Sequence, residues 1–452
     1  MSGAELADLA RRVVERASGA EEVEAFALRK VETEVEALRG EVDALSSAET
    51  RGVGVRVIVD GRQGYASTAM VTDEALAAAL DEARTNAAVA TPDEANVLPD
   101  PQTPPDVGDL ARPGFLEVPV DHKIQLALDL ERTATDADPR VRGVDMAKYG
   151  DAYVEVALLS TRGLQRTAAR TEAWAFVLPL ASHDDETQTG MGVTIGRSPG
   201  ELDVEGAGRE GAERAVRLLG ATKPTSRKAA VVFDPHATAA FLGVLARALS
   251  AEAVLKGRSL FADRLGDPVA GEALTLVDDG VRPDGPATAP WDSEGVPHQT
   301  TVVIDQGVLR SYLHNTWTAH RSGEPTRSTG NASRGSFKSS PGVAPTNLYL
   351  SPGDAEPSRI LADAGDGVYV QEVVGLHSGA NPISGDFSVG VTGLAVRGGE
   401  LAEPFREATV ASTIVEVLRS ITAVGSDLRF FPFGGALGGS TVLVSEMAVS
   451  GR

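Results

Sequence analysis

The sequence predicts an α+β protein: an N-terminal antiparallel sheet with helices, a middle α/β segment, and a β-rich C-terminal domain around a buried helix. Runs that alternate apolar and polar residues occur within the first 60 residues, which is typical of half-buried strands. Helical patterns recur through the first half of the chain. After residue 228, one apolar helix is followed by many short strand-like runs separated by Gly, Asp and Pro.

Length and composition indicate a globular chain with more than one domain. At 452 residues the chain exceeds the size at which a single hydrophobic core keeps growing, and 42% of its residues are hydrophobic against 23% charged. Shifts in composition divide it into an N-terminal α+β subdomain (1–90), a Pro-rich linker (91–113), a middle α+β subdomain (114–227) and a β-rich C-terminal domain (228–452).

Charge and residue usage exclude several classes of function. The chain has no cysteine, which excludes disulfides, thiolate nucleophiles and cysteine metal ligands. Its net charge of −22 argues against nucleic acids and anionic membranes as partners, because both need basic patches. No apolar run is long enough to span a bilayer, and residues 1–19 lack the pattern of a signal peptide. We therefore expect a cytoplasmic protein.

Two helices are expected in the N-terminal subdomain. Apolar residues over 4–14 recur at roughly helical spacing. Thr72 is a suitable N-cap for an alanine- and leucine-rich helix over 73–86, because its hydroxyl can accept a hydrogen bond from the first turn.

Two alternating runs predict strands between these helices. Val31–Leu38 alternates apolar residues with glutamates, which indicates a strand with an acidic outer face. Residues 53–59 repeat the period of two and end at Asp60-Gly61, a dipeptide typical of hairpin turns. Together with the helices, these strands predict a curled antiparallel sheet covered on one side.

The middle of the chain begins with a segment that lacks periodicity. Residues 91–113 contain six prolines and several acidic residues, so we expect a linker or an extended surface segment. The elements expected after it are a helix over 121–135, strands over Tyr153–Leu159 and Glu172–Leu180, a loop over 182–190 and a helix over 204–219.

The C-terminal domain begins with a helix that is apolar nearly all round, within Phe233–Ser259. Asp234 is a good N-cap, Pro235 suits the first helical position, and Gly257 is expected to end the helix. Such a helix belongs in the middle of a large domain. The charged Arg247 must therefore pair with a carboxylate, for which Glu252 is a candidate, or reach solvent or a cleft.

The sequence contains none of the common catalytic motifs H-E-x-x-H, G-x-S-x-G or the P-loop. Histidines and carboxylates of the C-terminal domain could assemble a zinc site from separate loops, although no pair has ligand-like spacing within one element. The candidates for such a site are His298, His314, His320, His377, Asp292 and Glu294.

Two glycine-rich stretches, residues 326–336 and 377–393, combine Asn and Gly in tight loops. Loops of this composition suit either the binding of a peptide at a strand edge or a packed corner of a domain. The residue pattern leaves both interpretations open.

The chain resembles the TldD/PmbA family, and specifically its PmbA (TldE) branch. The resemblance extends over nearly the whole chain and is densest after residue 228. It is carried by RGVGVRVIVDGRQGYAST, LKGRSLFADRLGDPVA, TLVDDG, WDSEGVPHQTTVVIDQGVLRSYLHNTWTA, STGNASR, TNLYLSPG, HSGANPISGDFSVGVTG and AVGSDLRF.

The resemblance implies that this chain has no zinc site of its own. The catalytic TldD branch carries H-E-x-x-x-H on a helix and a late cysteine as a third zinc ligand. Aligned through the shared K-G-x-S, these motif positions hold Leu242, Gly243 and Arg247 here, and the cysteine has no counterpart. Two imidazoles and a base are thus missing, so zinc is expected in a partner subunit and no cofactor in this chain.

The resemblance also implies a function. PmbA-type chains pair with a TldD-type zinc chain in a cytoplasmic metallopeptidase that degrades or trims unfolded or leader-bearing peptides, with a homodimer as an option for the chain alone. We expect substrate-cleft or interface roles for His377, Asn381, Asp386, Phe387, Asn331, Asp292 and Glu294, unless the polar ones simply satisfy backbone donors. The alternatives are a free-standing hydrolase with its own His/carboxylate metal site and a homo-oligomeric peptide-binding protein.

Overall fold

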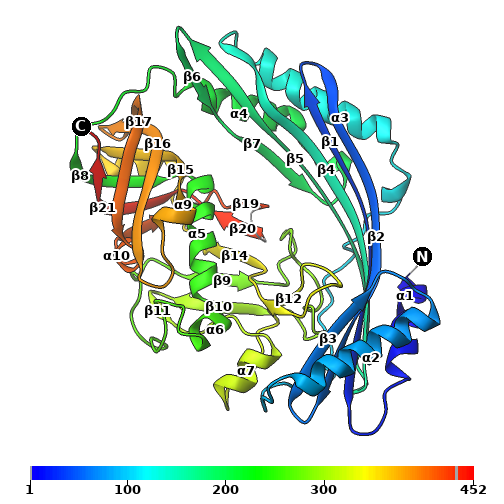
Figure 1. Cartoon of the computed structure of the whole chain (residues 1–452). Coiled ribbons are helices and arrows are strands. Elements are labelled where there is room, and N and C mark those ends of the chain that lie inside the picture. Colours follow the sequence, from blue (N-terminus) through cyan, green and yellow to red (C-terminus); the bar gives the residue numbers. More distant parts are fainter. Residues whose placement is uncertain (1–2, 433–435) are drawn as a thin grey trace.

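One long, curved antiparallel sheet forms the N-terminal half of the chain in this computed structural model, which describes residues 3–432 and 436–452 (Figure 1). The strand order is β3-β2-β1-β4-β5-β6, with β7 also paired to β5. The strands are β1 (Glu22–Leu38), β2 (Glu41–Val59), β3 (Arg62–Thr68), β4 (Val141–Ser160), β5 (Gln165–His183), β6 (Glu186–Thr189) and β7 (Gly192–Gly196). Since β1 lies between β2 and β4, the N-terminal and middle segments share one sheet.

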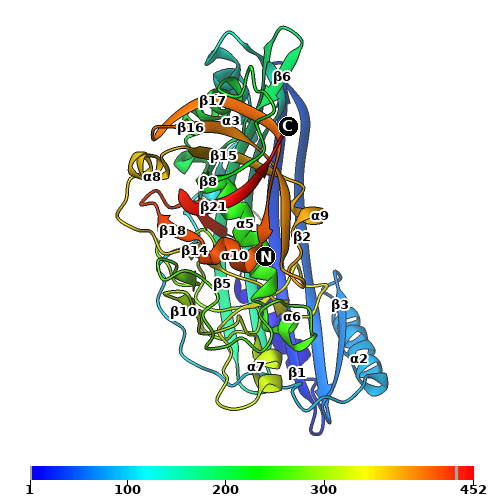
Figure 2. The same ribbon diagram turned by 90° about the vertical axis from the view of Figure 1, so that its left-hand side faces the viewer.

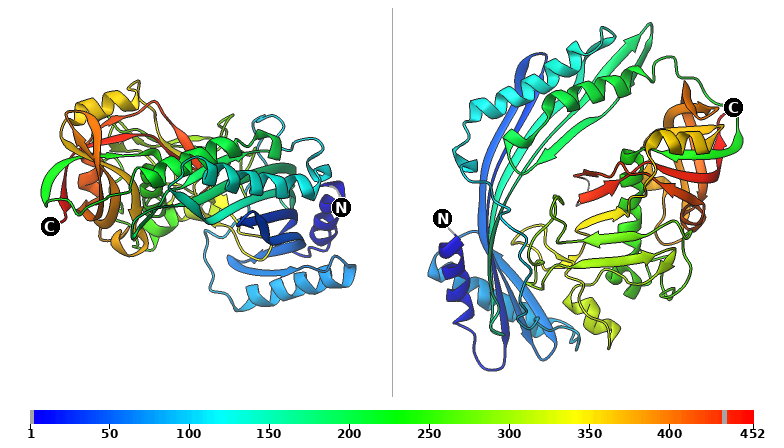
Figure 3. Two further views of the ribbon diagram at one scale, coloured as in Figure 1. Left: turned by 90° about the horizontal axis from the view of Figure 1, so that it is seen from above. Right: turned by 180° about the vertical axis from the view of Figure 1, so that it is seen from behind.

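Helices cover one face of this sheet because apolar residues alternate along its strands. On β1, Val23, Ala25 and Ala27 pack into a core with two of the helices, and Val35 and Ala37 pack on the same face against a third. The opposite face is the inner side of the curve and lies toward the C-terminal half (Figures 1 and 3). The helices of this half are α1 (Gly3–Val14), α2 (Asp73–Val89), α3 (Val120–Asp136) and α4 (Val204–Val216), with short 3-10 turns at Phe115–Glu117 and Pro199–Glu201.

In the C-terminal half, five strands close into a ring. β17 pairs with both β16 and β21, and β15 and β8 complete the circuit, as Figure 2 shows from the side. Closing the ring leaves these strands without free edges along their paired residues. The ring strands are β8 (Arg227–Phe233), β15 (Gly367–Val374), β16 (Asp386–Arg397), β17 (Glu400–Thr413) and β21 (Val442–Ser450), and β18 (Ile421–Val424) pairs with β21 outside it.

A second sheet lies beside the ring, in the order β11-β10-β9-β14-β20-β19. Its strands are β9 (Leu276–Asp279), β10 (Thr300–Asp305), β11 (Val308–Leu309), β14 (Asn347–Leu350), β19 (Arg429–Phe431) and β20 (Ala436–Gly439), and a separate pair is formed by β12 (Ala332–Ser333) and β13 (Gly342–Val343). The remaining helices are α5 (Pro235–Ala248), α6 (Ala251–Leu255), α7 (Thr316–Ser322), α8 (Pro357–Ala364), α9 (Leu376–Gly379) and α10 (Ile414–Arg419). The predicted α+β class is confirmed.

Helix α5 is the buried helix expected from the sequence. It contacts β8 and β15 of the ring and β14, β19 and β20 of the second sheet. Asp234 caps it by accepting a hydrogen bond from the Ala237 N–H at 2.9 Å. The helix ends earlier than predicted, because Leu249 and Ala251 exchange backbone hydrogen bonds with Leu313 instead of continuing it. The expected single helix is therefore two, α5 and α6.

One further expectation needs correction. Residues 182–190 contain the end of β5, the turn and the whole of β6 in a β5–β6 hairpin, instead of a loop. Arg247 meets its expectation by reaching solvent: it is exposed, and the candidate partner Glu252 binds Lys256 at 2.5 Å instead. The hydration of its charge in solvent explains how α5 tolerates it.

The Pro-rich segment packs along the sheet instead of linking free domains. Leu98 and Leu110 are buried, and the Leu110 carbonyl accepts a hydrogen bond from the Thr171 N–H of β5 at 3.1 Å. No helix in the described part of the chain is long and apolar enough to cross a membrane.

Candidate functional site

The predicted site residues lie in two separate places. Asp292, Glu294 and Asn331 are buried where loops of the C-terminal half meet the inner face of the sheet. The second group lies on α9 (His377), in the turn after it (Asn381) and at the start of β16 (Asp386 and Phe387), beside α5.

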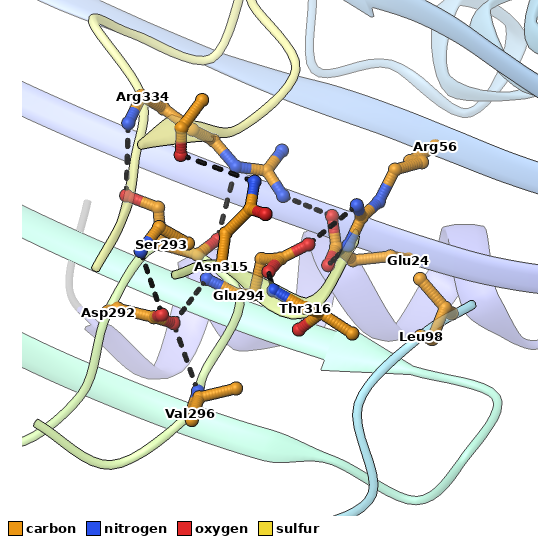
Figure 4. A network of polar contacts seen from close by, with 12 residues as sticks. Glu24, Arg56, Leu98, Asp292, Ser293, Glu294, Val296, Asn315, Thr316 and Arg334 are labelled. Atoms are coloured by element: carbon orange, nitrogen blue, oxygen red, sulfur yellow. Dashed lines mark hydrogen bonds and ion pairs between the residues drawn. The ribbon is translucent and has the colours of Figure 1, made fainter. Parts of the chain in front are cut away.

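At the first place, charged residues from both halves form a buried network (Figure 4). Glu24 on β1 and Arg56 on β2 are cross-strand neighbours, and their side chains bond at 2.7 Å. Arg56 also bonds Glu294 of the C-terminal half at 2.8 Å. Arg334, which belongs to the C-terminal half as well, pairs with Glu24. The four side chains are at most 3% exposed. Each buried charge lies next to an opposite one, and this pairing offsets the free-energy cost of removing the charges from water.

Asp292 and Asn331 hold the loops that carry this network. The Asp292 carboxylate accepts hydrogen bonds from the backbone N–H groups of Glu294 (2.8 Å), Val296 (3.1 Å) and Ala332 (2.9 Å). Asn331 donates to Asp278 at 2.7 Å, and Asp278 in turn accepts from the Thr346 N–H at 2.7 Å. Asp292 therefore satisfies backbone donors, and Asn331 satisfies a carboxylate acceptor, within the junction between the two halves.

Burial and neighbouring charge move several pKa values here. Burial opposes ionisation of Glu24, but the guanidinium groups of Arg334 and Arg56 outweigh it and lower its pKa. Burial and the Glu294 carboxylate raise the pKa of Asp292 to about 8, although three N–H donors favour its charged form. Burial lowers the pKa of both His298 and His314 to about 4, so each imidazole is neutral near pH 7.

A cavity of about 280 Å³ lies next to the network, between sheet and loops. Its sheet side is apolar, with Phe26, Leu28 and Val156, and its loop side includes Trp291 and Arg334. The Arg334 guanidinium lies over the Phe26 ring, 4.9 Å from its centre. The cavity is thus apolar with a few charged groups at its wall, as is typical of ligand pockets.

At the second place, the polar residues close a tight turn. The Asn381 side-chain oxygen accepts hydrogen bonds from the N–H groups of Ile383 (2.9 Å) and Ser384 (3.2 Å), and Asp386 accepts from the Ser384 hydroxyl at 2.6 Å. Phe387 is 1% exposed and packs edge-on against Phe241 of α5. Asn381 and Asp386 thus fix the shape of the turn, and Phe387 packs it against α5.

The exposed surface of this turn is partly apolar. His377 is exposed, as are Val374 and Ile383, whose exposed fractions are 52% and 53%. A surface of this kind is available for contact with another chain or a peptide.

The positions of the zinc motif on α5 do not fit a metal ion. Leu242 is fully buried in the hydrophobic core, Gly243 has no side chain, and Arg247 is exposed. None of these residues offers an imidazole, thiolate or carboxylate, and the side chains at 242 and 247 lie in different surroundings. Across residues 3–432 and 436–452, no three His, Asp or Glu side chains lie close enough together to hold a metal ion, and this includes the histidines of the alternative metal site.

Sequence reasoning missed Glu24, Arg56 and Arg334. Glu24 and Arg56 lie in strands whose register is visible only once β1 is paired with β2. A usable signal was present, because charged residues in otherwise apolar runs such as VEAFAL and VGVRVIV need buried partners.

Acidification is expected to destabilise the fold through His298. Its pKa is about 4 when folded against 6.5 as the ordinary value, so between these pH values only the unfolded chain binds the proton. The contribution of the neutral His298 to the free energy of unfolding is therefore fully present above pH 6.5 and decreases as the pH falls toward 4. When the pH is lowered from 7 to 4, the free energy of unfolding of the His298→Asn variant should fall by about 2 to 3 kcal/mol less than that of the wild type.

Urea denaturation of both proteins at pH 7, 5.5 and 4 measures this difference. The exposed His122, changed to Asn, serves as the matched control, with a profile parallel to that of the wild type. Parallel profiles for the wild type and His298→Asn would contradict the role of His298.

Models of three family domains match the chain in order. The PmbA/TldA metallopeptidase domain 1 matches residues 23–87, the central domain matches 113–219, and the C-terminal domain matches 226–451. The C-terminal match starts at β8 and includes the ring, α5 and the second sheet.

Individual relatives agree with these matches. A metalloprotease of Methanothermobacter thermautotrophicus is 32% identical over 321 residues, which is 69% of this chain and 68% of that protein. Metalloprotease PmbA of Escherichia coli O157:H7 is 26% identical over 418 residues, covering 91% of this chain and 88% of the relative.

Two solved structures share the fold. A Thermotoga maritima protein described as a candidate modulator of a DNA gyrase has a TM-score of 0.90 at 27% identity, covering 99% of this chain and 100% of that one. TldE of Thermococcus kodakarensis has a TM-score of 0.88 at 22% identity, with both chains covered completely, and this second likeness concerns the fold alone.

Proposed function

The chain belongs to the PmbA/TldD metallopeptidase family, and we propose that it acts there as the non-catalytic subunit of a heteromeric zinc metallopeptidase. Its partner is a TldD-type chain that holds the zinc, and the assembly degrades or trims unfolded or leader-bearing peptides in the cytoplasm. The observation that carries this proposal is the residue set Leu242, Gly243 and Arg247 on α5, which has no group that binds zinc or activates water.

Two features of the structure support a role in holding substrate or partner. The junction between the sheet and the C-terminal half contains two cavities whose linings include arginines. Beside α5, the end of β15 presents the exposed Val374, and the turn around Asn381 presents the exposed Ile383. A non-catalytic subunit needs such surfaces, because its contribution is to position peptide and partner.

We expect peptide hydrolysis only when this chain is combined with a TldD-type partner. The assay compares the purified chain, the partner and the co-expressed pair on an unfolded protein substrate, each with and without a chelator. Activity should appear in the pair and disappear on chelation, because the zinc that would activate water for peptide hydrolysis is expected in the partner alone. A partner variant with the motif glutamate changed to glutamine is the control for contaminating peptidases.

Metal analysis of the purified chain separates the alternatives. Stoichiometric zinc together with chelator-sensitive activity in the chain alone would contradict the proposal and favour a free-standing hydrolase. Peptide binding by a homo-oligomer, with no gain of activity on adding the partner, would favour the peptide-binding protein.

A further inference from the structure

Arginines line a second cavity in the same junction. The cavity measures about 570 Å³ and lies between β5, the end of β7 and residues 283–287 of the C-terminal half. The guanidinium groups of Arg112, Arg170 and Arg197 border it, together with the carboxylates of Glu172, Glu201 and Asp284. In a chain with 42 Lys and Arg against 64 Asp and Glu, a cavity with as many guanidinium as carboxylate groups is less acidic than the molecule as a whole, and Asp284 is already paired with Arg282 at 2.8 Å.

The three guanidinium groups differ in how their charge is compensated. Arg112 bonds Glu201 at 2.6 Å, and Arg170 lies 3.9 Å from Glu172, beyond hydrogen-bond range. Within the described residues the Arg197 guanidinium has no carboxylate within 4 Å and donates to the Gly285 carbonyl at 2.9 Å, whereas the Arg197 backbone N–H donates to Glu201 at 2.8 Å. Burial and then the charges of Arg112 and Arg170 lower the pKa of Arg197. An anion bound between Arg170 and Arg197 would compensate both charges.

This cavity adjoins the apolar cavity beside the buried network. Arg170 and Ala287 line both of them. The apolar cavity, at about 280 Å³, presents Phe26, Leu28 and Trp291. An anionic group on Arg170 thus lies next to a space suited to an apolar side chain.

We propose that the two cavities together bind the C-terminal residue of a peptide. Its α-carboxylate lies between Arg170 and Arg197, and its apolar side chain enters the neighbouring cavity. That the ligand is a peptide rests on the proposed function, whereas the carboxylate and the apolar group follow from the two cavities. The subunit then holds the C-terminus of a substrate and leaves the segment upstream for the partner.

Isothermal titration calorimetry on the full chain without a partner tests this proposal. The probes are acetyl-Ala-Ala-Leu with a free carboxylate, the same peptide as its C-terminal amide, and the amide of acetyl-Ala-Glu-Leu. The free acid should bind at least about tenfold more tightly than either amide, because a charged hydrogen bond is lost with the carboxylate. Arg197→Gln and Arg170→Gln should each weaken the binding of the free-acid peptide by a similar factor of about ten. The exposed Arg209→Gln on α4 is the control and should leave binding unchanged.

Several outcomes would overturn the proposal. One is equal affinity for the free-acid peptide and its amide. Another is unchanged affinity for the free acid in Arg170→Gln or Arg197→Gln when circular dichroism shows that the variant is folded. A third is no binding of the free-acid peptide at millimolar concentration. Tight binding of the glutamate-containing amide would instead assign the arginines to acidic side chains. The hydrolysis assay with the partner is read independently, so failure of the proposed function leaves this binding result interpretable.

Discussion

Replacing Arg56 with methionine is expected to lower the free energy of unfolding by about 3 to 5 kcal/mol. Methionine fills part of the same space but removes the guanidinium that bonds Glu24 at 2.7 Å and Glu294 at 2.8 Å. Glu24 keeps its pairing with Arg334, and Glu294 keeps the Thr316 N–H at 2.9 Å. Two buried carboxylates would nevertheless lose the cation between them, and a buried charge without compensation is costly.

Urea denaturation monitored by tryptophan fluorescence measures this effect. The matched control is Arg140→Met, because Arg140 is 48% exposed and pairs with Asp138 at 2.8 Å on the surface, where an ion pair contributes about 1 kcal/mol at most. Glu24 and Arg56 belong to the sheet and Glu294 to the C-terminal half, so Arg56→Met should also open the junction to limited proteolysis. Equal, small losses of stability in the two variants would show that the network contributes little.

Local features of the fold could be predicted because neighbouring residues determine them. Asp60 and Gly61 both have positive φ, 50° and 72°, as a tight hairpin turn requires. Thr72 and Asp234 cap the helices that follow them by accepting N–H bonds, as expected. Each of these signals lies within four residues of the structure that it specifies.

Features that depend on distant pairing could not be predicted. β1 pairs with β4 across more than 100 residues, so the single sheet shared by both segments is invisible in either segment alone. The end of α5 is set by Leu313, which exchanges backbone hydrogen bonds with Leu249 and Ala251 from more than 60 residues away. Propensity favours helix through this point, and tertiary hydrogen bonds override it.

The candidate site shows the same division. Asp292, Glu294 and Asn331 are site candidates in the sequence through the family resemblance, and the first two also as possible metal-binding carboxylates, but their surroundings depend on Glu24, Arg56 and Asp278 from other strands. The arginines of the second cavity come from three segments of the sheet half and approach one another only in the folded chain. The spacing of these three arginines along the chain therefore does not predict that they border one cavity.

Changing Gly439 to alanine is expected to cost about 3 kcal/mol of stability, at the upper end of the range for overpacking. Gly439 lies on β20 where that strand passes the start of α5. A Cβ added there would lie 1.7 Å from the Pro235 carbonyl oxygen and 3.0 Å from the Ala239 nitrogen. Both atoms belong to the helix backbone, so no side-chain rotation relieves the contact, and α5 has to move away from the second sheet.

Gly200→Ala is the matched control, because a Cβ at Gly200 meets no atom within 4 Å and its φ is not positive. Its stability should stay within about 0.5 kcal/mol of the wild type under the same urea denaturation. If Gly439→Ala proved equally neutral, the close approach of β20 to α5 would not be required. Helix α5, which carries Leu242, Gly243 and Arg247, would then have room to shift within its core. If the variant is strongly destabilised, α5 is fixed in place by backbone contact as well as by its apolar side chains.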